Sequence, residues 1–162
     1  MAQFISGYPL RGGSTLDRAL LVKWVQRTYR ELYPDYPLEH LAQTVGQYLS
    51  GETPLWWVVL DSAAGSSGDP SLPFVPIACL WVGNAVDQAM GDRHAHIFLL
   101  YVAPEYRRQG IGAALLRHAE QWARERGDRQ IGLQVFVSNQ PALNLYEKLG
   151  YQPQAYWMVK LL

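Results

Sequence analysis

The segment best suited to chemistry is a loop that follows an apolar stretch and opens a helical pattern. Residues 97–102 predict a buried strand, and Pro104 ends it because proline cannot donate to a strand ladder. The loop then carries two arginines and two glycines, in the order Arg107, Arg108, Gln109, Gly110, Ile111, Gly112 and Ala113. Glycine lets backbone approach a ligand closely, and the first N–H groups of a helix are unpaired at the positive end of its dipole. This order predicts a site for a phosphate or a pyrophosphate.

Spacing separates the kinds of loop that bind phosphate. A P-loop needs Gly-Lys-Ser/Thr at the helix start, but Ala113 and Ala114 follow Gly112. A dinucleotide-binding loop needs a third glycine where this chain has Leu115, and its glycines come directly after the strand. Gly110 and Gly112 are also compatible with an ordinary tight turn, so a second segment of the chain has to decide.

Arg107-x-x-Gly110-x-Gly112 resembles the acyl-CoA loop of the GNAT N-acetyltransferases, Gln/Arg-x-x-Gly-x-Gly/Ala. Farther along, Asn139 to Tyr151 is similar to the family's segment N-x-x-A-x-x-L-Y-x-K-x-G-F/Y. The two motifs with their flanking strands cover roughly residues 94–162, whereas the preceding residues carry no signature. The chain is identified as a member of this family, expected to form a single domain over residues 1–162.

The resemblance implies a donor site for acetyl-CoA. Backbone N–H groups of the loop would bind the pyrophosphate, and the preceding strand would pair with the pantetheine arm. The residues implied are Leu100, Val102, Arg107, Arg108, Gln109, Gly110, Ile111, Gly112, Ala113 and Asn139. Asn139 is equally suited to capping the short helix that follows it, and both roles can hold at once. The resemblance implies no metal.

Acetyl transfer needs a neutral amine, donors for the oxyanion and a proton for the departing thiolate. Tyr146 lies where the family often has a general acid, although a packing role is the alternative. His96 and Phe98 lie where many relatives carry a glutamate base. A phenyl ring cannot accept a proton, whereas histidine has an ordinary pKa of about 6.5. His96 also suits a hydrogen-bonded core role, so a water chain, His94 or Glu105 remain alternatives, and an amine that is already neutral needs no base.

The expected reaction is direct attack of a primary amine on acetyl-CoA in a ternary complex, because Cys79, the single cysteine, offers no clear covalent nucleophile. The acceptor is a small molecule or a peptide that the residues do not identify. One group of aromatic residues suits either an acceptor pocket or an ordinary core: Tyr29, Tyr33, Tyr36, Trp56 and Trp57. The alternatives are a non-catalytic acyl-CoA-binding regulatory module and an acyltransferase that uses a longer acyl chain.

Composition limits the class of protein. The chain has 162 residues, 49% of them hydrophobic, which suits one domain with a sizeable core. Its net charge of zero predicts no nonspecific affinity for nucleic acid, and the arginines that follow Arg108 suit a solvated helix face. No apolar run reaches the ~20 residues of a membrane span, and no signal peptide is evident. We therefore expect a cytoplasmic protein without a membrane partner, and a homodimer is left open beside a monomer.

Hydrophobic periodicity predicts the element order β-αα-βββ-α-β-α-β. The expected strands cover residues 4–10, 55–60, 75–82, 97–102, 131–137 and 156–162. The expected helices cover residues 16–33, 37–50, 111–126 and 139–149. Residues 62–73 are expected to form a hairpin loop, and residues 83–93 a polar connection.

A strand, a crossover helix and another strand imply one parallel pair within a mixed sheet. The expected fold class is therefore α/β (α+β mixed): a GNAT-like mixed, mostly antiparallel twisted sheet with helices on both faces and one central parallel strand pair. The resemblance implies in addition that the two strands of this pair splay apart and leave a cleft for the CoA arm.

Overall fold

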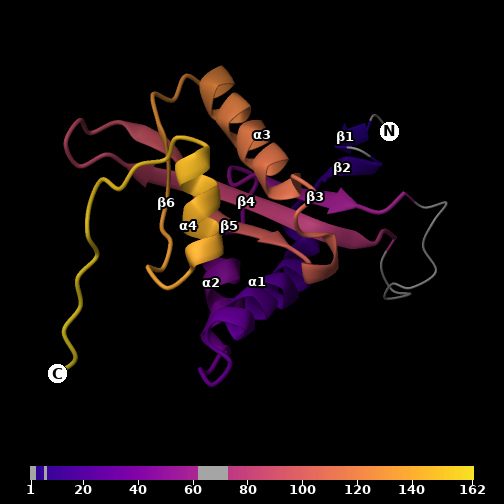
Figure 1. Cartoon of the computed structure of the whole chain (residues 1–162), viewed down its shortest axis with the longest axis horizontal. Helices are drawn as coiled ribbons and strands as arrows, with labels where there is room; N and C mark the ends of the chain where they lie inside the picture. Colours follow the sequence, from indigo (N-terminus) through magenta and orange to yellow (C-terminus); the bar gives the residue numbers. More distant parts are fainter. Residues whose placement is uncertain (1–2, 6, 62–72) are drawn as a thin grey trace.

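The computed structural model describes residues 3–5, 7–61 and 73–162 (Figure 1). Its strands are β1 (Gln3–Ile5), β2 (Tyr8–Gly12), β3 (Leu55–Val59), β4 (Pro76–Val86), β5 (Arg93–Val102) and β6 (Ile131–Leu133). Its helices are α1 (Arg18–Leu32), α2 (His40–Tyr48), α3 (Ile111–Arg126) and α4 (Gln140–Lys148), with short 3₁₀ turns η1 (Thr15–Asp17) and η2 (Pro104–Tyr106).

The strands form one sheet in the order β1-β2-β3-β4-β5-β6. All neighbours are antiparallel except β5 and β6, which α3 connects and which run parallel. The mixed sheet with one parallel pair is thus confirmed. The pair lies at the edge of the described sheet rather than at its centre, because the segment expected to form the last strand, residues 156–162, does not join it.

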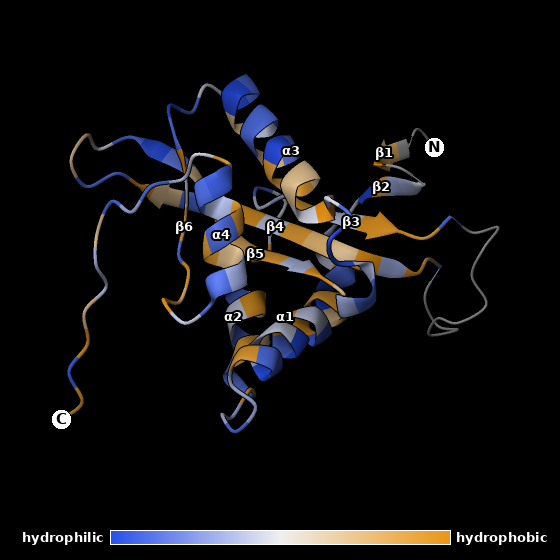
Figure 2. Cartoon of the chain, in the orientation of Figure 1, coloured by the Kyte–Doolittle hydropathy of each residue, from blue (hydrophilic) through white to orange (hydrophobic). Residues whose placement is uncertain are grey.

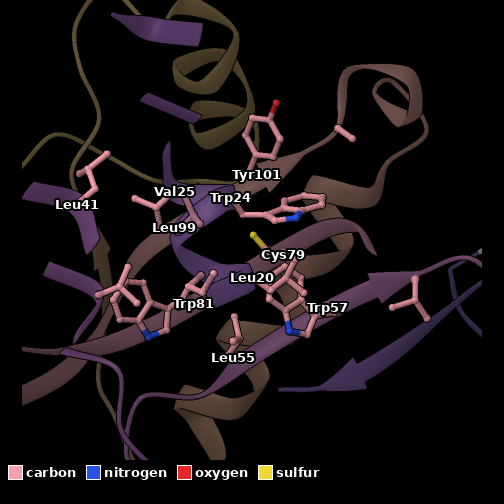
Figure 3. Packing of buried hydrophobic residues seen from close by; sticks show 14 of the residues in the cluster. Leu20, Trp24, Val25, Leu41, Leu55, Trp57, Cys79, Trp81, Leu99 and Tyr101 are labelled. Carbon is pink, nitrogen blue, oxygen red and sulfur yellow. The ribbon is translucent and has the colours of Figure 1, made fainter. Parts of the chain in front are cut away.

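Helices cover both faces of the sheet, as expected. On one face α1 and α2 pack against β3, β4 and β5, where Trp24 meets Trp57 and Tyr101 with ring centroids 5.6 and 5.5 Å apart (Figure 3). On the other face α3 and α4 pack against the same strands. Figure 2 shows the hydropathy pattern that accompanies the packing of α3: this helix is apolar where it meets the sheet and hydrophilic over its C-terminal half.

The ends of α3 and α4 follow local sequence signals. Gly110 and Gly127 flank α3 with φ of 80° and 89°, a left-handed conformation that side chains other than glycine rarely adopt. Asn139 caps α4, because its Oδ1 accepts a hydrogen bond from the Ala142 N–H at 3.4 Å. Gly150, with φ of 90°, follows the end of α4. The predictions for these two helices are confirmed.

The expectations for the first half of the chain need two corrections. The predicted first strand is a hairpin of β1 and β2, in which Gly7 adopts a φ of 85°. The predicted second helix begins at His40 and not at Pro37, because a turn closed by Leu41 N–H and Leu38 C=O precedes it. The predicted loop falls largely on residues 62–72, outside the described residues.

Three predicted boundaries in the second half are also wrong. Both ends of the polar connection, residues 83–86 and Arg93, belong to β4 and β5, since antiparallel pairing continues to Val86 and Arg93. β6 ends at Leu133, four residues short of the prediction, because its pairing with β5 stops there. Residues 156–162 form no strand: they are extended and exposed, away from the sheet (Figure 1).

No helix among the described residues is long and apolar enough to cross a membrane. Within the same part of the chain, no three histidine, cysteine or acidic side chains gather closely enough to hold a metal ion.

Candidate active site

The first turn of α3 presents unpaired backbone donors. The first hydrogen bond of this helix joins Ala114 N–H to Gly110 C=O at 3.0 Å, so the N–H groups of Ile111, Gly112 and Ala113 have no partner within the helix. A Cβ added at Gly112 would lie 3.3 Å from Leu145 Cδ2, which shows how closely α4 approaches this turn. The absence of a side chain here leaves the donors accessible beside α4, and such a turn suits an anion.

β5 offers a second set of free backbone groups beside this turn. Ala103 N–H bonds to Ile77 C=O at 2.9 Å, and residues along a strand face opposite sides alternately. The N–H and C=O groups of Leu100 and Val102 therefore face away from β4, toward the side of β6. β6 pairs with β5 only alongside Ala95 to Ile97. Val102 C=O already accepts a hydrogen bond from Arg107 Nε at 2.9 Å, so the groups left open to an extended ligand that pairs as a strand would are the N–H and C=O of Leu100 and the N–H of Val102.

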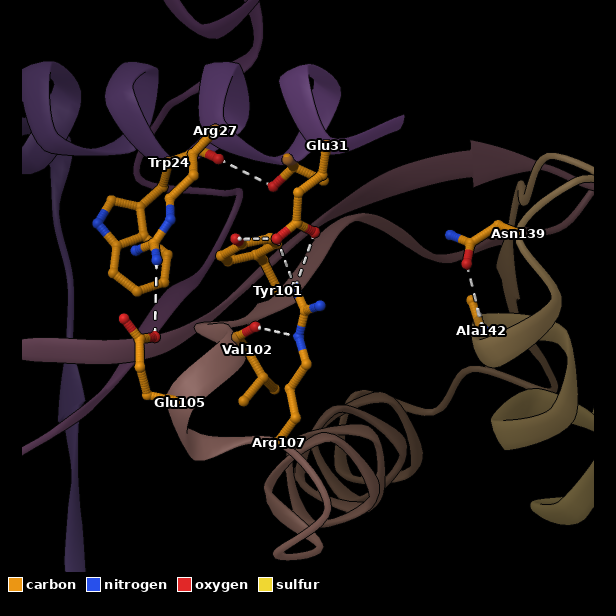
Figure 4. A network of polar contacts seen from close by, with 10 residues as sticks. Trp24, Arg27, Glu31, Tyr101, Val102, Glu105, Arg107, Asn139 and Ala142 are labelled. Atoms are coloured by element: carbon orange, nitrogen blue, oxygen red, sulfur yellow. Dashed lines mark hydrogen bonds and ion pairs between the residues drawn. The ribbon is translucent and has the colours of Figure 1, made fainter. Parts of the chain in front are cut away.

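An ion pair fixes the start of the loop to α1 (Figure 4). Arg107 donates two hydrogen bonds to the Glu31 carboxylate, at 2.8 and 3.0 Å, and its Nε–H donates to Val102 C=O at 2.9 Å. The Tyr101 hydroxyl donates to the same carboxylate at 2.9 Å. Burial and the contact with Glu31 raise the pKa of Tyr101 to about 12, so this phenol stays a neutral donor. The guanidinium of Arg107 therefore holds the loop in place.

The N-terminal hairpin supports the loop from the other side. The Tyr8 hydroxyl donates to Gln109 Oε1 at 3.1 Å, and the rings of Tyr8 and Tyr106 meet edge to face. Arg108 adopts a φ of 62°, which side chains other than glycine adopt only when their surroundings enforce it. Its exposed side chain leaves the guanidinium accessible to solvent and to an anion.

His96 lies between two glycines. It is opposite Gly83 of β4 and Gly132 of β6, and the space over these glycines is taken by the Phe98 ring, 5.9 Å from the His96 ring, and by His94. Burial lowers the pKa of His96, and the nearby His94 lowers it further. The imidazole is therefore neutral near pH 7 and able to accept a proton.

The other positions proposed for a base are occupied differently. Phe98 is an additional residue in β5 where the register with β4 shifts, and its ring lies over Gly83, 5.0 Å from the ring of Trp81. His94 is buried, with Nδ1 2.9 Å from Ala95 C=O. Glu105 faces Arg27 at 3.7 Å (Figure 4). Of these groups, His96 is the one whose neutral ring is partly exposed and makes no hydrogen bond to a residue that the structure describes.

Tyr146 lies on α4, next to Leu145, the residue that approaches Gly112. Its ring packs against the core on the α3 side of the sheet, 5.7 Å from the ring of Tyr151. Burial raises the pKa of Tyr146, and its hydroxyl makes no hydrogen bond to the residues that the structure describes. His96 contacts Phe98, which packs on the α1 side. The candidate acid and the candidate base thus belong to opposite faces of the sheet.

The aromatic residues considered for an acceptor pocket separate into two groups. Trp57 is fully buried in the core, and Trp56 packs against α3. In contrast, Tyr33 joins Tyr36 and Phe136, with ring centroids 5.3 and 5.1 Å away, and so connects the end of α1 with the segment after β6. Tyr29 packs partly buried against the α1 side of the core.

Sequence patterns missed the residues that hold the loop. Glu31 lies 76 residues before Arg107, and Tyr8 lies 101 residues before Gln109. Neither belongs to a motif, so no spacing signal connects them to the loop. Cys79 is fully buried, and burial raises the pKa of its thiol far above the usual range. The thiol is thus unsuited to a nucleophile, in line with the expectation from sequence.

Comparison with known proteins gives a match to one family model and matches to curated acetyltransferases, two of which are described here. The acetyltransferase (GNAT) family model matches residues 18–151. The ribosomal protein bS18-alanine N-acetyltransferase of Escherichia coli is 42% identical over 41% of this chain and 45% of its own length. The streptothricin acetyltransferase of Streptomyces lavendulae is 36% identical over 56% of this chain and 49% of its own length. Across the curated relatives compared, the matches span 29% to 59% of the relative's length.

Solved structures share the fold over nearly the whole chain. A crystal structure of a predicted acetyltransferase from Clostridium acetobutylicum with acetyl-CoA has a TM-score of 0.68 and 18% identity, covering 95% of this chain and 96% of that one. At this identity the likeness concerns the fold alone.

Proposed function

The chain belongs to the acetyltransferase (GNAT) family, and from this premise we propose that it transfers an acetyl group from acetyl-CoA to a primary amine, as a single domain and without a covalent enzyme intermediate. The observation that supports this most is the adjacency of two sets of free backbone groups. The N–H groups at the start of α3 suit a pyrophosphate, and the open edge of β5 suits an extended amide-bearing arm.

In this proposal the loop binds the donor mainly through backbone. Residues Gln109 to Ala113 would surround the pyrophosphate, with Arg108 adding a positive charge at the exposed side. Leu100 and Val102 would pair with the pantetheine amides. Arg107 would contribute indirectly, because its bonds to Glu31 and Val102 fix the loop. Asn139 would hold α4 at the proper angle through its cap.

Acetyl-CoA supplies a thioester, and the amine would attack its carbonyl carbon. His96 would take the proton of the attacking ammonium or amine, since its lowered pKa keeps the ring neutral. Tyr146 would donate a proton to the departing sulfur, since its raised pKa keeps the phenol protonated. The two groups belong to opposite faces of the sheet, which suits an amine that arrives from the α1 side and a donor that lies on the α3 side.

The relatives indicate the reacting group of the acceptor, an amine, but not one particular acceptor. Relatives are named for acetylation of an alanine of a ribosomal protein, of thialysine and of streptothricin. We propose a primary amine of a small molecule or of a peptide.

An amine panel tests the function. Purified protein would be given acetyl-CoA with polyamines, aminoglycosides, amino acids and peptides with free N-termini, and thiol release and product mass would be followed. The proposal predicts thiol release that depends on one class of amine, together with an acetylated product. Binding of CoA without turnover on any amine would instead indicate a binding module, and turnover only with longer acyl-CoA would indicate a different acyltransferase.

A further inference from the structure

Three aromatic side chains from two distant segments meet at the end of α1. The ring of Tyr33 lies 5.3 Å from that of Tyr36 and 5.1 Å from that of Phe136, which follows β6. The two pairs of rings stand at 64° and 82°, so their faces do not stack. Tyr36 is 67% exposed and Phe136 is 46% exposed. These three residues, here called the aromatic corner, thus leave ring surface open to solvent.

The turn that follows α1 holds two of these rings in place. Residues 33–36 read Tyr-Pro-Asp-Tyr, and Tyr36 N–H bonds back to Tyr33 C=O at 3.3 Å. Proline fixes φ near about −65°, and Pro-Asp is a common centre of tight turns. The two tyrosines are therefore ordered before a ligand arrives, which lowers the entropic cost of binding one.

The aromatic corner lies close to the open backbone groups of β5. β6 pairs Gly132 with His96, and its pairing ends at the next residue. Continued in the same register, β6 would bring Phe136 opposite Leu100, but Phe136 packs against Tyr33 instead. Its Cα lies at most about 14 Å from that of Gly132, because four residues of chain span no more. A molecule with one end at His96 can therefore reach the aromatic corner with its other end.

The surroundings of the aromatic corner are negatively charged. The chain between α1 and α2 has no lysine or arginine. Glu31, at the end of α1, is paired with Arg107, whereas Asp35 and Glu39 are exposed and form no ion pair with a described residue. On the facing side, residues 130–146 contain no charged side chain. The carboxylates of this turn are thus available to a cation from outside.

The chain's own cations are engaged elsewhere. Arg30, the last cation before the turn, lines a groove along α1 together with Lys23 and Arg27. Among the described residues no arginine guanidinium lies over a ring of the aromatic corner. Aromatic faces attract a cation within about 6 Å, and nearby carboxylates strengthen the attraction at low salt. The chemistry that fits this place is an ammonium group.

We propose that the acceptor is an amine with a second positive charge, which the aromatic corner holds while the other amine reaches the acetyl group. The proposal rests on the proposed function, because it concerns the acceptor of that reaction. The reacting nitrogen loses a proton, forms the bond to the acetyl carbon and displaces the sulfur, which takes up a proton. The second ammonium group keeps its proton throughout and serves recognition only.

Two amines of the same length test this recognition. Cadaverine and hexylamine differ in that one ends in an ammonium group and the other in a methyl group. Their affinities would be measured by NMR titration of protein saturated with CoA, so that no transfer occurs. The wild-type protein should bind cadaverine about 3- to 30-fold more tightly, as expected for an ammonium group on aromatic faces.

Variants of the turn identify the groups responsible. Tyr36→Leu should remove most of the preference for cadaverine, and Tyr36→Phe, the matched control that keeps the ring, should retain it. Asp35→Asn should weaken cadaverine binding about threefold at low salt and leave hexylamine binding unchanged. Equal affinities of the wild-type protein for the two amines would overturn the proposal. So would a preference for cadaverine that Tyr36→Leu leaves unchanged.

Turnover separates this proposal from the proposed function. With acetyl-CoA as donor, Tyr36→Leu should raise the KM for cadaverine by the factor found in binding, with the KM for acetyl-CoA unchanged. A preference for cadaverine in binding that Tyr36→Leu removes, without acetylation of either amine, would support the cation site and refute the transfer. Acetylation of both amines with equal kcat/KM would support the transfer and refute the cation site.

Discussion

Gly112→Asp tests the anion site at the start of α3. A Cβ at this position would lie 3.3 Å from Leu145 Cδ2 and 4.0 Å from Val102 Cγ2, in contact but without severe overlap. The carboxylate would lie beside the unpaired N–H groups of the first turn and would compete for them. At a separation of about 6 Å and an effective dielectric constant of about 20, two unit charges repel by about 3 kcal/mol. We therefore expect roughly a 100-fold loss of CoA affinity.

Folding should be affected much less. An acidic residue in the first turn of a helix is favourable by about 0.3–1 kcal/mol, which offsets part of the crowding against Leu145. Gly112→Asn is the matched control, since it has the same shape without the charge. The ratio of the two affinities, measured by calorimetry on variants with a normal melting temperature, isolates the electrostatic effect. Equal CoA affinity in folded Gly112→Asp and wild-type protein would refute the anion site.

Three further substitutions test the roles proposed for side chains. His96→Ala should lower kcat with little change in the KM for acetyl-CoA. Because the pKa of His96 is lowered, the wild-type kcat/KM should fall only as the pH drops through a value below 6.5. The variant should lose this fall in kcat/KM at acidic pH. A pH profile equal to that of the wild type would show that His96 has a structural role. Tyr146→Phe should lower kcat by about 10²–10⁴-fold with a similar melting temperature, since the hydroxyl bonds to no described residue; normal turnover would exclude the acid role. Glu31→Gln should raise the KM for acetyl-CoA at most about fivefold and lower the melting temperature by a few degrees at most, because its ion pair with Arg107 is partly exposed; a kcat loss beyond about 100-fold would point to direct chemistry instead.

Local signals made the two helices of the second half predictable, although not the lengths of its strands. Gly110, Gly127 and Asn139 mark the ends of α3 and α4 through conformations and caps that depend on neighbouring residues only. Because the helix α3 crosses over between β5 and β6, these two strands are expected to run parallel, as they do. The position of the glycine-containing loop before α3 was predictable for the same reason, since its residues are adjacent in sequence.

Contacts between distant residues were not predictable. The partner of Arg107 is Glu31, on a helix in the first part of the chain, and no pattern within either segment indicates the other. The additional residue Phe98 in β5 depends on how β4 pairs with it. Residues 156–162 have the composition of a strand, but a strand forms only where the backbone pairs with a sheet edge, and in this structure these residues pair with none.

Hydrogen exchange with and without acetyl-CoA tests the central claim most directly, because the claim is that backbone amides bind the donor. Saturating acetyl-CoA should slow exchange in peptides that cover residues 109–114 and 98–102, with little change in α1. The same experiment with Gly112→Asp at equal concentration should show no protection in either peptide. Protection confined to other parts of the chain, or equal protection in both proteins, would contradict the account.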